Sequence, residues 1–554
     1  MIGVVVQSID RAIAAEFFEL FKTPWEFYRS EQRYDVVICT QEDPIDGAGE
    51  LVLFYSAEVV RFDTRNRVPA KSRRGGTTVS YEGKRIPIYG NVATFPADPI
   101  SALRDEASQE SVVFRTDTDG RTTVRIGYDL FQEVRFLLSV GQPAAHAGTA
   151  ALELHITLLR DLITRSGFPL VEIPPVPDGY SFIACLTHDL DHPVLRNHWL
   201  DHTMFGFLYR ASVGALVDFC RRRKPIKNLC ANWAAVCRLP FVYLGIAKDF
   251  WREFDRYLEI EAGLGATFFV IPRKDYPGRR ANGNRAARRA SRYDVADIKP
   301  QLGKIISSGC EVGLHGIDAW LDADGGREES KRVSEVTGAT QVGVRMHWLF
   351  FDERSPAVLD RAGFSYDSTV GYNETVGYRA GTAQAYKPAG SAILLELPLH
   401  VMDTALFYPN HLNLTNEGAE KVVWRLIDDM VRFGGAMTIN WHDRSIAPER
   451  LWNDFYLKLL DELKRRGAWF PTAAQAVSWF RNRRSAAFDS VSAENGVVKI
   501  KVSSDPIREL PGLRVRVHRP QNRHSPGATP PGSSAGFVDV GFDTNIETSV
   551  SISD

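Results

Sequence analysis

Four short apolar segments in the middle of this chain each end in histidine, aspartate or arginine. These polar ends lie around Asp189, His315, Arg345 and His442, and helix-like segments separate the apolar runs from one another. Strands that alternate with helices along a chain pair in parallel, so their carboxyl ends gather on one rim, where ligands and catalytic groups collect. The pattern therefore predicts an α/β fold, a distorted (β/α) barrel whose functional site lies on one face.

The first of these strand ends is the richest in potential ligands. Residues 182–186 are apolar and read as one buried strand, and residues 187–192 (THDLDH) follow directly. Two carboxylates at i and i+2, flanked by two imidazoles, suit a metal site with a neighbouring general base. A capped turn or a solvated loop is the alternative for such a cluster.

The chain is long enough for two or three domains, since 554 residues exceed the usual size of one. We predict an N-terminal α/β domain of unknown role over residues 1–175 and the barrel over residues 176–485. The boundary follows from four prolines and a glycine within residues 168–179, which interrupt any regular element. Residues 486–554 read as a small β-rich appendage, in which the Pro-, Ser- and Gly-rich residues 520–536 are predicted to be disordered.

The composition limits the partners and the cellular location that we expect for this protein. A net charge of −1 gives no overall basic footprint, so no nucleic-acid partner is expected. The six cysteines form no CxxC pair and read as buried free thiols. The first residues resemble a strand rather than a signal peptide, and no stretch reaches the roughly 18 apolar residues of a spanning helix. We therefore expect a soluble, cytoplasmic protein, while its oligomeric state is not predicted.

Residues 193–250 are predicted to form a helical insertion between two core strands. Apolar and aromatic residues at 204–209 and 239–244 flank the basic run 221–224. Basic residues beside aromatic-rich helices are typical of segments that rest on a membrane surface. The same composition also fits an insertion packed on its own domain, so peripheral membrane contact is one of two alternatives.

Several segments together resemble one known family. Residues 187–191 (THDLD), 266–270 (ATFFV), 311–316 (EVGLHG) and 441–442 (WH) are similar to the motifs of the NodB-type polysaccharide deacetylases, carbohydrate esterase family 4. The resemblance covers residues 180–485 and leaves both ends of the chain outside it. It implies a distorted (β/α) barrel that holds a divalent metal through Asp-His-His and removes N- or O-acetyl groups from sugars. Zinc is the first expectation for the metal, with cobalt, manganese or nickel as alternatives.

The first two family motifs imply a base and two metal ligands. By resemblance, Asp189 is the general base, and Asp191 and His315 bind the metal. The family places a second histidine four residues after the first, where this chain has Ala319. The third protein ligand is therefore missing from its usual place.

Two residues are candidates for the missing ligand. Asp318 lies next to the vacant position, and a carboxylate is an acceptable zinc ligand. His347 belongs to the third motif, where this chain replaces the proline of the family's Arg-x-Pro. The alternatives are a working site with more water ligands and a weakened or lost metal site.

The other site residues also follow from the resemblance. Arg345 matches the arginine of the third motif and would pair with the base, holding its charge and orientation. His442 matches the general acid of the last motif. Trp348, Trp441 and His188 are expected to contact the substrate, since aromatic faces can stack on a pyranose ring. For the two tryptophans, core packing is the alternative.

Together these expectations describe a metal-dependent carbohydrate deacetylase, a hydrolase acting on non-peptide carbon–nitrogen or ester bonds. Its partner would be an acetylated sugar or polysaccharide precursor, because a cytoplasmic enzyme meets nucleotide- or lipid-linked sugars rather than a finished wall. One alternative is a barrel with weakened chemistry that binds carbohydrate or acts as a scaffold in polysaccharide biosynthesis, which the missing histidine favours. Another is metal-dependent hydrolysis of a non-sugar amide by the same residues.

Overall fold

The computed structural model describes residues 1–41, 49–96, 103–118, 120–280, 283, 287–505, 507–521, 536–542, 544 and 546–552. The chain folds into two compact units: unit 1 comprises Met1–Gly179, Ala380–Tyr386 and Trp479–Asp554, and unit 2 comprises Tyr180–Arg379 and Lys387–Ser478. The division after Gly179 coincides with the proline-rich boundary, whereas the C-terminal strands group with unit 1 instead of standing alone. Most of the stretch predicted to be disordered, residues 522–535, lies outside the described residues.

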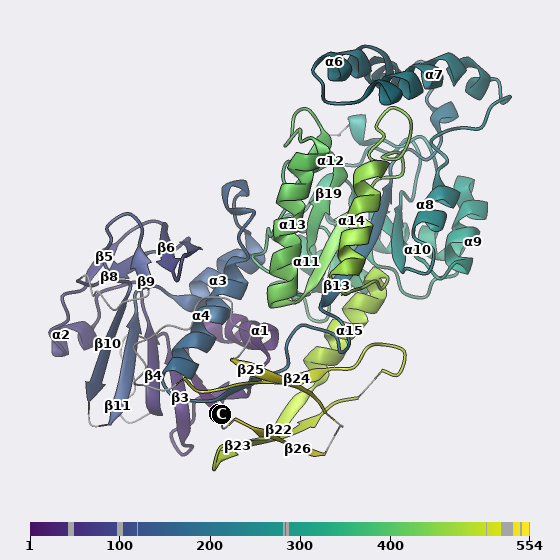
Figure 1. Ribbon diagram of the computed structural model, residues 1–554. Helices are drawn as coiled ribbons and strands as arrows, with labels where there is room; N and C mark the ends of the chain where they lie inside the picture. Colours follow the sequence, from purple (N-terminus) through teal and green to yellow (C-terminus); the bar gives the residue numbers. More distant parts are fainter. Residues whose placement is uncertain are drawn as a thin grey trace. The chain divides into compact units, whose positions relative to one another are not determined.

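Unit 2 is built on a nine-stranded sheet in which all neighbouring strands are parallel (Figure 1). The strands follow the order β18-β17-β16-β15-β14-β13-β20-β19, and β21 also pairs with β13. Their bounds are β13 (Phe182–Leu190), β14 (Ala266–Val270), β15 (Glu311–Gly316), β16 (Val344–Met346), β17 (Tyr366–Asp367), β18 (Leu395–Glu396), β19 (Leu399–Met402), β20 (Ala436–Asn440) and β21 (Ala468–Trp469). β13, β14 and β20 consist entirely of buried residues, as expected for parallel strands covered on both faces.

The sheet curls so far that its two edge strands come close together. β18 ends at Glu396 and β19 begins at Leu399, and three residues of chain span at most about 11 Å. The backbone N–H of Leu399 also donates to the carbonyl of Val370, just beyond β17, over 2.9 Å. No ladder between described strands joins the two edges, so the sheet is an open, curled relative of the barrel that the sequence predicts.

Helices outside the sheet each bury one apolar face. In α14, Phe455, Leu459 and Leu463 follow one another at intervals of one turn, and all three are buried. Local signals set the helix ends: the Asp322 carboxylate accepts from backbone N–H groups at the start of α10, and Gly338 ends that helix at φ 76°. The helices are α8 (Phe254–Ile260), α9 (Lys299–Ser307), α10 (Ala323–Thr337), α11 (Ser355–Ala362), α12 (Asp403–Phe407), α13 (Asn416–Phe433), α14 (Asn453–Arg465) and α15 (Ala473–Ser485), which crosses into unit 1.

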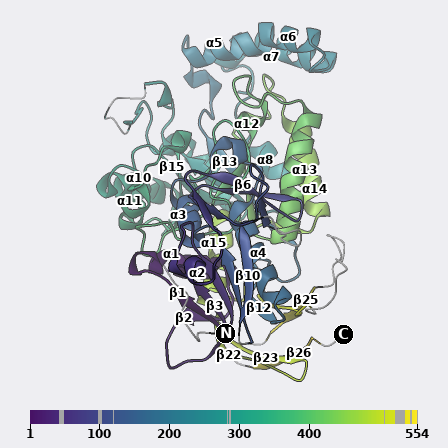
Figure 2. The same ribbon diagram turned by 90° about the vertical axis from the view of Figure 1, so that its left-hand side faces the viewer.

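A helical segment fills the connection between β13 and β14. It consists of α5 (His202–Tyr209), a π-helical turn (Arg210–Gly214), α6 (Ala215–Cys220) and α7 (Ile226–Tyr243). In both views α6 and α7 lie side by side at one end of unit 2 (Figures 1 and 2). Across the described residues, no helix is both long and apolar enough to cross a membrane.

Unit 1 contains a six-stranded sheet in the order β10-β11-β4-β3-β1-β2, parallel except for the β10–β11 pair. Its elements are β1 (Ile2–Val5), α1 (Arg11–Phe21), β2 (Trp25–Phe27), β3 (Tyr34–Cys39), β4 (Gly49–Tyr55), α2 (Arg61–Arg65), β10 (Val113–Thr118), β11 (Arg121–Ile126), α3 (Leu130–Ser139) and α4 (Ala151–Arg165). The smaller sheets use β5 (Lys71–Arg73), β6 (Thr77–Tyr81), β7 (Lys84–Ile88), β8 (Val92–Thr94), β9 (Leu103–Asp105), β12 (Leu170–Glu172), β22 (Ala487–Glu494), β23 (Val497–Ser503), β24 (Arg514–His518), β25 (Phe537–Gly541) and β26 (Glu547–Ser551). β12 pairs with β24, and this long-range ladder ties the C-terminal strands to the N-terminal part.

Candidate metal centre

The rim of the unit 2 sheet carries a set of polar side chains because parallel strands end together there. Thr187, Asp189, His315, Arg345 and Asn440 lie in β13, β15, β16 and β20, whereas Asp191, His347, Asp403 and His442 follow the ends of β13, β16, β19 and β20. Successive side chains of a strand point to opposite faces of the sheet. Thr187, Asp189 and Asp191 therefore share one face of β13, and the residues between them face the other way.

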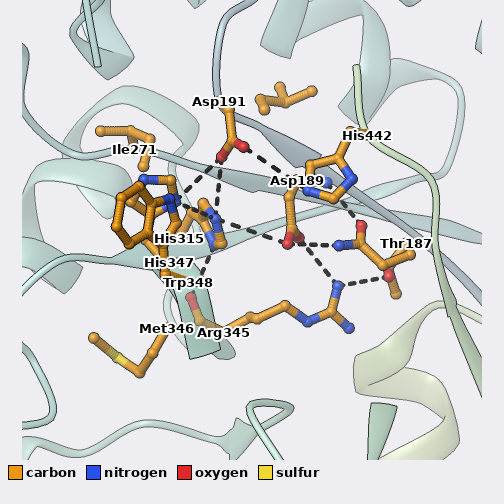
Figure 3. A network of polar contacts seen from close by, with 12 residues as sticks. Thr187, Asp189, Asp191, Ile271, His315, Arg345, Met346, His347, Trp348 and His442 are labelled. Atoms are coloured by element: carbon orange, nitrogen blue, oxygen red, sulfur yellow. Dashed lines mark hydrogen bonds and ion pairs between the residues drawn. The ribbon is translucent and has the colours of Figure 1, made fainter. Parts of the chain in front are cut away.

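Asp191, His315 and His347 converge on one point (Figure 3). Asp191 Oδ1 lies 3.3 Å from His315 Nε2 and 3.2 Å from His347 Nδ1, and these two ring nitrogens lie 3.0 Å apart. One ligand atom from each residue lies within 4.8 Å of the others. Both histidines are buried and Asp191 is half-buried. A carboxylate with two imidazoles is a donor set that catalytic zinc accepts, with a further position left open.

Hydrogen bonds assign the tautomer of both imidazoles. His315 Nδ1 lies 3.0 Å from the carbonyl oxygen of Arg345, and His347 Nε2 lies 3.2 Å from that of Arg289. A carbonyl only accepts, so each of these nitrogens carries the proton and the opposite nitrogen presents a lone pair. Asp191 Oδ1 is buried and has no hydrogen-bond partner. Three acceptor atoms therefore face one another with no donor among them, an arrangement that fits a bound cation.

The charge states of these groups also suit a metal. Burial lowers the pKa of His347 to about 4 against the opposing pull of Asp191, so the imidazole is neutral near pH 7. Burial raises the pKa of Asp191, but the protonated His442 beside it is among the groups that outweigh burial and hold that pKa well below its usual value. Neutral imidazole and ionised carboxylate are the forms that bind metal ions.

Asp189 lies beside this cluster in a buried network of donors (Figure 3). Arg345 Nη1 donates to Asp189 Oδ1 over 3.0 Å, and Asn440 Nδ2 donates to Oδ2 over 2.7 Å. Arg345 Nη1 also donates to Thr187 Oγ1 over 2.7 Å. Burial raises the pKa of Asp189, yet His315 and Arg345 outweigh it and lower that pKa below its usual value. The carboxylate is therefore ionised and able to accept a proton.

His442 approaches the cluster from the other side. Its Nε2 lies 3.8 Å from Asp191 Oδ2, and its Nδ1 donates to Asp403 Oδ1 over 2.6 Å. Asp403 also accepts from the backbone N–H of His442 and from the Ser445 hydroxyl, so its carboxylate is held in place. Burial lowers the pKa of His442, but Asp403 outweighs it and raises the pKa to about 10. His442 is therefore protonated near neutral pH and able to donate a proton.

Two residues expected to contact substrate lie on the opposite face of their strands. His188, between Thr187 and Asp189, is fully buried, its ring lies tilted against that of Tyr257 at 4.4 Å, and its Nε2 bonds to Glu261. Trp441, which precedes His442, is also fully buried and stacks on Tyr456 of α14 at 4.9 Å. The strand period of two explains both placements. Each residue lies between two rim residues, so its side chain points to the opposite face of the sheet.

The two remaining candidates are Asp318, a possible metal ligand, and Trp348, a possible substrate contact, and only the second lies at the centre. Asp318 does not enter the cluster found among the described residues; its carboxylate accepts from the Tyr276 hydroxyl at 2.7 Å and the Arg279 backbone N–H at 2.8 Å. Trp348 directly follows His347, is 41% exposed, and places its ring 5.9 Å from the His347 ring. Its backbone lies at φ 62°, which is uncommon for a bulky residue and turns the chain sharply at the rim. Trp348 is thus the predicted substrate contact that borders the centre.

Two residues of the site were not assigned from the sequence. Asn440 ends the apolar run of β20, and Asp403 follows the apolar run of β19. Both therefore obey the same rule as the other rim residues, an apolar strand that ends in a polar side chain. That signal was present for each, but it did not say which strand end lies beside Asp189 and which beside His442.

No family model matches this chain, and no curated protein matches it either. Among solved structures, it is similar to a candidate polysaccharide deacetylase from Mycobacterium smegmatis, with 19% identity over 56% of this chain and 95% of that one, at a TM-score of 0.33. It is also similar to PuuE allantoinase, with 15% identity over 56% and 93% of the two chains and a TM-score of 0.31. A cobalt-bound family 4 acetyl xylan esterase from Clostridium thermocellum shares 15% identity over 42% and 87%, with a TM-score of 0.22. Similarity of this extent assigns no activity to the chain.

Proposed function

We propose that unit 2 is a metal-dependent hydrolase that removes acetyl groups, from nitrogen or oxygen, on a carbohydrate or polysaccharide precursor. One observation carries the proposal: the lone pairs of Asp191, His315 and His347 converge with no donor among them, directly beside an ionised carboxylate and a protonated imidazole. A cation site flanked by a proton acceptor and a proton donor is the equipment of a metal-assisted hydrolase.

His315, His347 and Asp191 would hold the metal, with zinc first among the candidates. Bound there, it would polarise the acyl carbonyl and lower the pKa of water to near 7. Every other step belongs to the chain itself. Asp189 would take the proton of the attacking water, while Arg345 and Asn440 keep its two oxygens oriented and charged.

His442 would complete the reaction from the opposite side. Its Nε2 points toward the cluster while Nδ1 is held by Asp403, so Nε2–H is the proton available for the departing nitrogen or oxygen. Trp348 at the rim supplies an exposed aromatic face beside the centre. Such a face suits the apolar side of a pyranose ring, and residues 187–191 and 311–316 resemble the motifs of enzymes that act on sugars.

The test uses the full chain, stripped of metal with a chelator and reloaded with Zn²⁺, Co²⁺, Mn²⁺ or Ni²⁺ in turn. Acetate release is measured from a panel of N-acetylated and O-acetylated mono- and oligosaccharides. We expect turnover that depends on metal and falls by about 10²- to 10⁴-fold in Asp189→Asn and in His442→Ala. Metal content is measured in every sample, because only a variant that binds metal but is inactive supports the proton-transfer roles of Asp189 and His442.

Two outcomes would overturn the proposal. If both variants keep full turnover with metal bound, the proton roles are wrong. If the loaded wild-type protein releases no acetate but binds sugars in calorimetry, the centre serves recognition rather than hydrolysis. Asp318→Asn is the matched control, because its carboxylate lies outside the cluster and loses only a charge.

A further inference from the structure

The helices between β13 and β14 form a hairpin, residues 202–244, with one face packed on unit 2. Its inward side joins a buried cluster that consists of Leu195, Phe207, Ala211, Ala235, Leu239, Trp251 and Ala447. Two polar contacts fix its ends: the Tyr243 hydroxyl donates to the His198 carbonyl, and Lys224 Nζ donates to the Arg450 carbonyl over 3.3 Å. The hairpin therefore packs on the rest of unit 2 through one face and leaves the opposite face outside.

That outer face is apolar, against the usual pattern for a surface helix. On α7 and its C-terminal cap, Ile226 is 55% exposed, Trp233 48%, Phe241 50% and the cap residue Leu244 71%. Their spacings of 7, 8 and 3 residues lie close to multiples of 3.6, so the four side chains form one stripe. The first arm of the hairpin, which runs from α5 through the π-helical turn to α6, repeats the pattern with Phe205, Tyr209, Val213 and Leu216, all exposed.

The concentration of exposed apolar groups is confined to this region. Of the 27 large hydrophobic side chains that are exposed among the described residues, 13 lie between positions 199 and 246. Exposed apolar residues scattered singly are ordinary, whereas a contiguous patch marks a surface that something covers. The charges around these residues indicate which kind of partner such a surface suits.

Those charges are almost entirely positive. Residues 202–248 contain eight lysines and arginines and a single acid, Asp218, which pairs with Lys224 at 3.5 Å. The exposed run Arg221–Arg223 lies at the turn between α6 and α7, and exposed Lys248 follows the far end of α7. Residues 202–248 thus give the apolar stripe basic side chains at both ends and no exposed carboxylate, and the nearby exposed Asp454 of α14 pairs with Lys227 at 3.7 Å.

We propose that this hairpin docks on an anionic lipid surface. Apolar side chains flanked by lysine and arginine are what an interfacial helix needs, since the first enter the headgroup boundary and the second contact lipid phosphates. A second copy of this chain fits less well, because the hairpin of each copy would present mostly basic groups to the basic groups of the other. No helix of the described residues can span the bilayer, so the hairpin lies on the surface.

The docking face and the metal centre share one end of unit 2. The hairpin leaves the carboxyl end of β13 and packs, through Ala447, on the loop that follows β20. Both strands carry rim residues of the centre. If the proposed hydrolysis holds, on which this consequence alone rests, docking favours acetylated substrates that are themselves carried on a membrane.

The test is binding of the full chain to vesicles by co-sedimentation, which needs no catalytic activity. One set contains phosphatidylcholine alone and the other phosphatidylcholine with phosphatidylglycerol. We expect binding to the anionic vesicles at least about tenfold tighter, weakened by salt. The double variant Phe241→Ser/Leu244→Ser should lose about tenfold or more, and Arg221→Gln/Arg222→Gln about fivefold per charge.

The matched control is Val431→Ser/Leu457→Ser, two exposed apolar residues on α13 and α14, which should bind as the wild type does. Thermal midpoints verify that every variant is folded. Equal or absent binding to both vesicle types overturns the proposal, as does full binding by the Phe241→Ser/Leu244→Ser variant. Light scattering supplies the remaining outcome: a dimer that this variant dissociates, without vesicle binding, would make a second copy the occupant instead.

Discussion

Replacing His347 by alanine tests the identity of the third metal ligand, which the sequence left open between His347 and Asp318. In the structure, His347 Nδ1 lies 3.2 Å from Asp191 Oδ1 and 3.0 Å from His315 Nε2. Structural zinc sites with four protein ligands bind with roughly 10–16 kcal/mol, so one ligand contributes about 2.5–4 kcal/mol. His347→Ala should therefore weaken zinc binding by about 10²- to 10³-fold.

Zinc affinity is measured by competition with a chromophoric chelator, and the cobalt-loaded protein reports ligand geometry through its visible absorption. Asp318→Asn is the matched variant because its carboxylate is occupied by Tyr276 and the backbone of Arg279. It should bind zinc as the wild type does and leave the cobalt spectrum unchanged. Far-ultraviolet circular dichroism of both variants excludes unfolding as the cause of any loss.

The reverse result would refute the reasoning. If Asp318→Asn loses zinc and His347→Ala keeps it, the carboxylate swings into the centre and the lone-pair geometry at His347 has another purpose. If neither variant changes the affinity, water completes the shell and the convergence of three acceptors is not what binds the ion.

Three further expectations concern charge. Asp403→Asn removes the partner that raises the pKa of His442 to about 10, so this pKa should fall. The alkaline limb of the pH–rate profile should then shift to lower pH by at least about one unit. A limb that does not shift would show that Asp403 does not set the pKa of the proton donor. Arg345→Met leaves the buried Asp189 charge without its arginine, which costs about 3–5 kcal/mol and lowers the thermal midpoint of unit 2 by roughly 10 °C. The double variant Arg345→Met/Asp189→Leu should recover most of this loss. A double variant as unstable as the single one would contradict the pairing. Burial lowers the pKa of His155 in unit 1 to about 4, so the unfolded chain binds more protons below pH 6.5 and stability falls from pH 6.5 toward pH 4, by about 2.5 kcal/mol at pH 4.5; denaturant unfolding of His155→Phe should lack that part of the acid sensitivity.

The rim residues could be predicted from the sequence because each depends on a local signal. An apolar run ends, a polar residue follows, and parallel pairing brings such ends together. The same reasoning predicts that Asp189, Asp191, His315 and His442 lie near one another. The strand period of two was equally local, and it explains why Trp441 faces the helices rather than the rim.

Other features depend on contacts between distant segments. β17 and β18 have two residues each, too few for a periodic pattern, so the curl of the sheet could not be predicted. β12 pairs with β24 across most of the chain, which is why the C-terminal strands group with the N-terminal part. The choice between Asp318 and His347 also depended on tertiary contacts, since Tyr276 occupies the first and Arg289 orients the second.

The use of His347 has a structural consequence. Arg345 and His347 lie two residues apart at the end of β16, so in the proposed mechanism one strand end would supply both the ion partner of the base and a ligand of the metal. Two bonds hold this end in place: the Met346 N–H donates to Thr369 Oγ1 over 3.0 Å, and Arg345 Nε donates to the Ser368 carbonyl over 3.0 Å. A displacement of β16 would therefore disturb the proposed metal ligand His347 and the ion partner of Asp189 together. With the third ligand on a loop after β15, as the family motif has it, the two groups would be held by different strands.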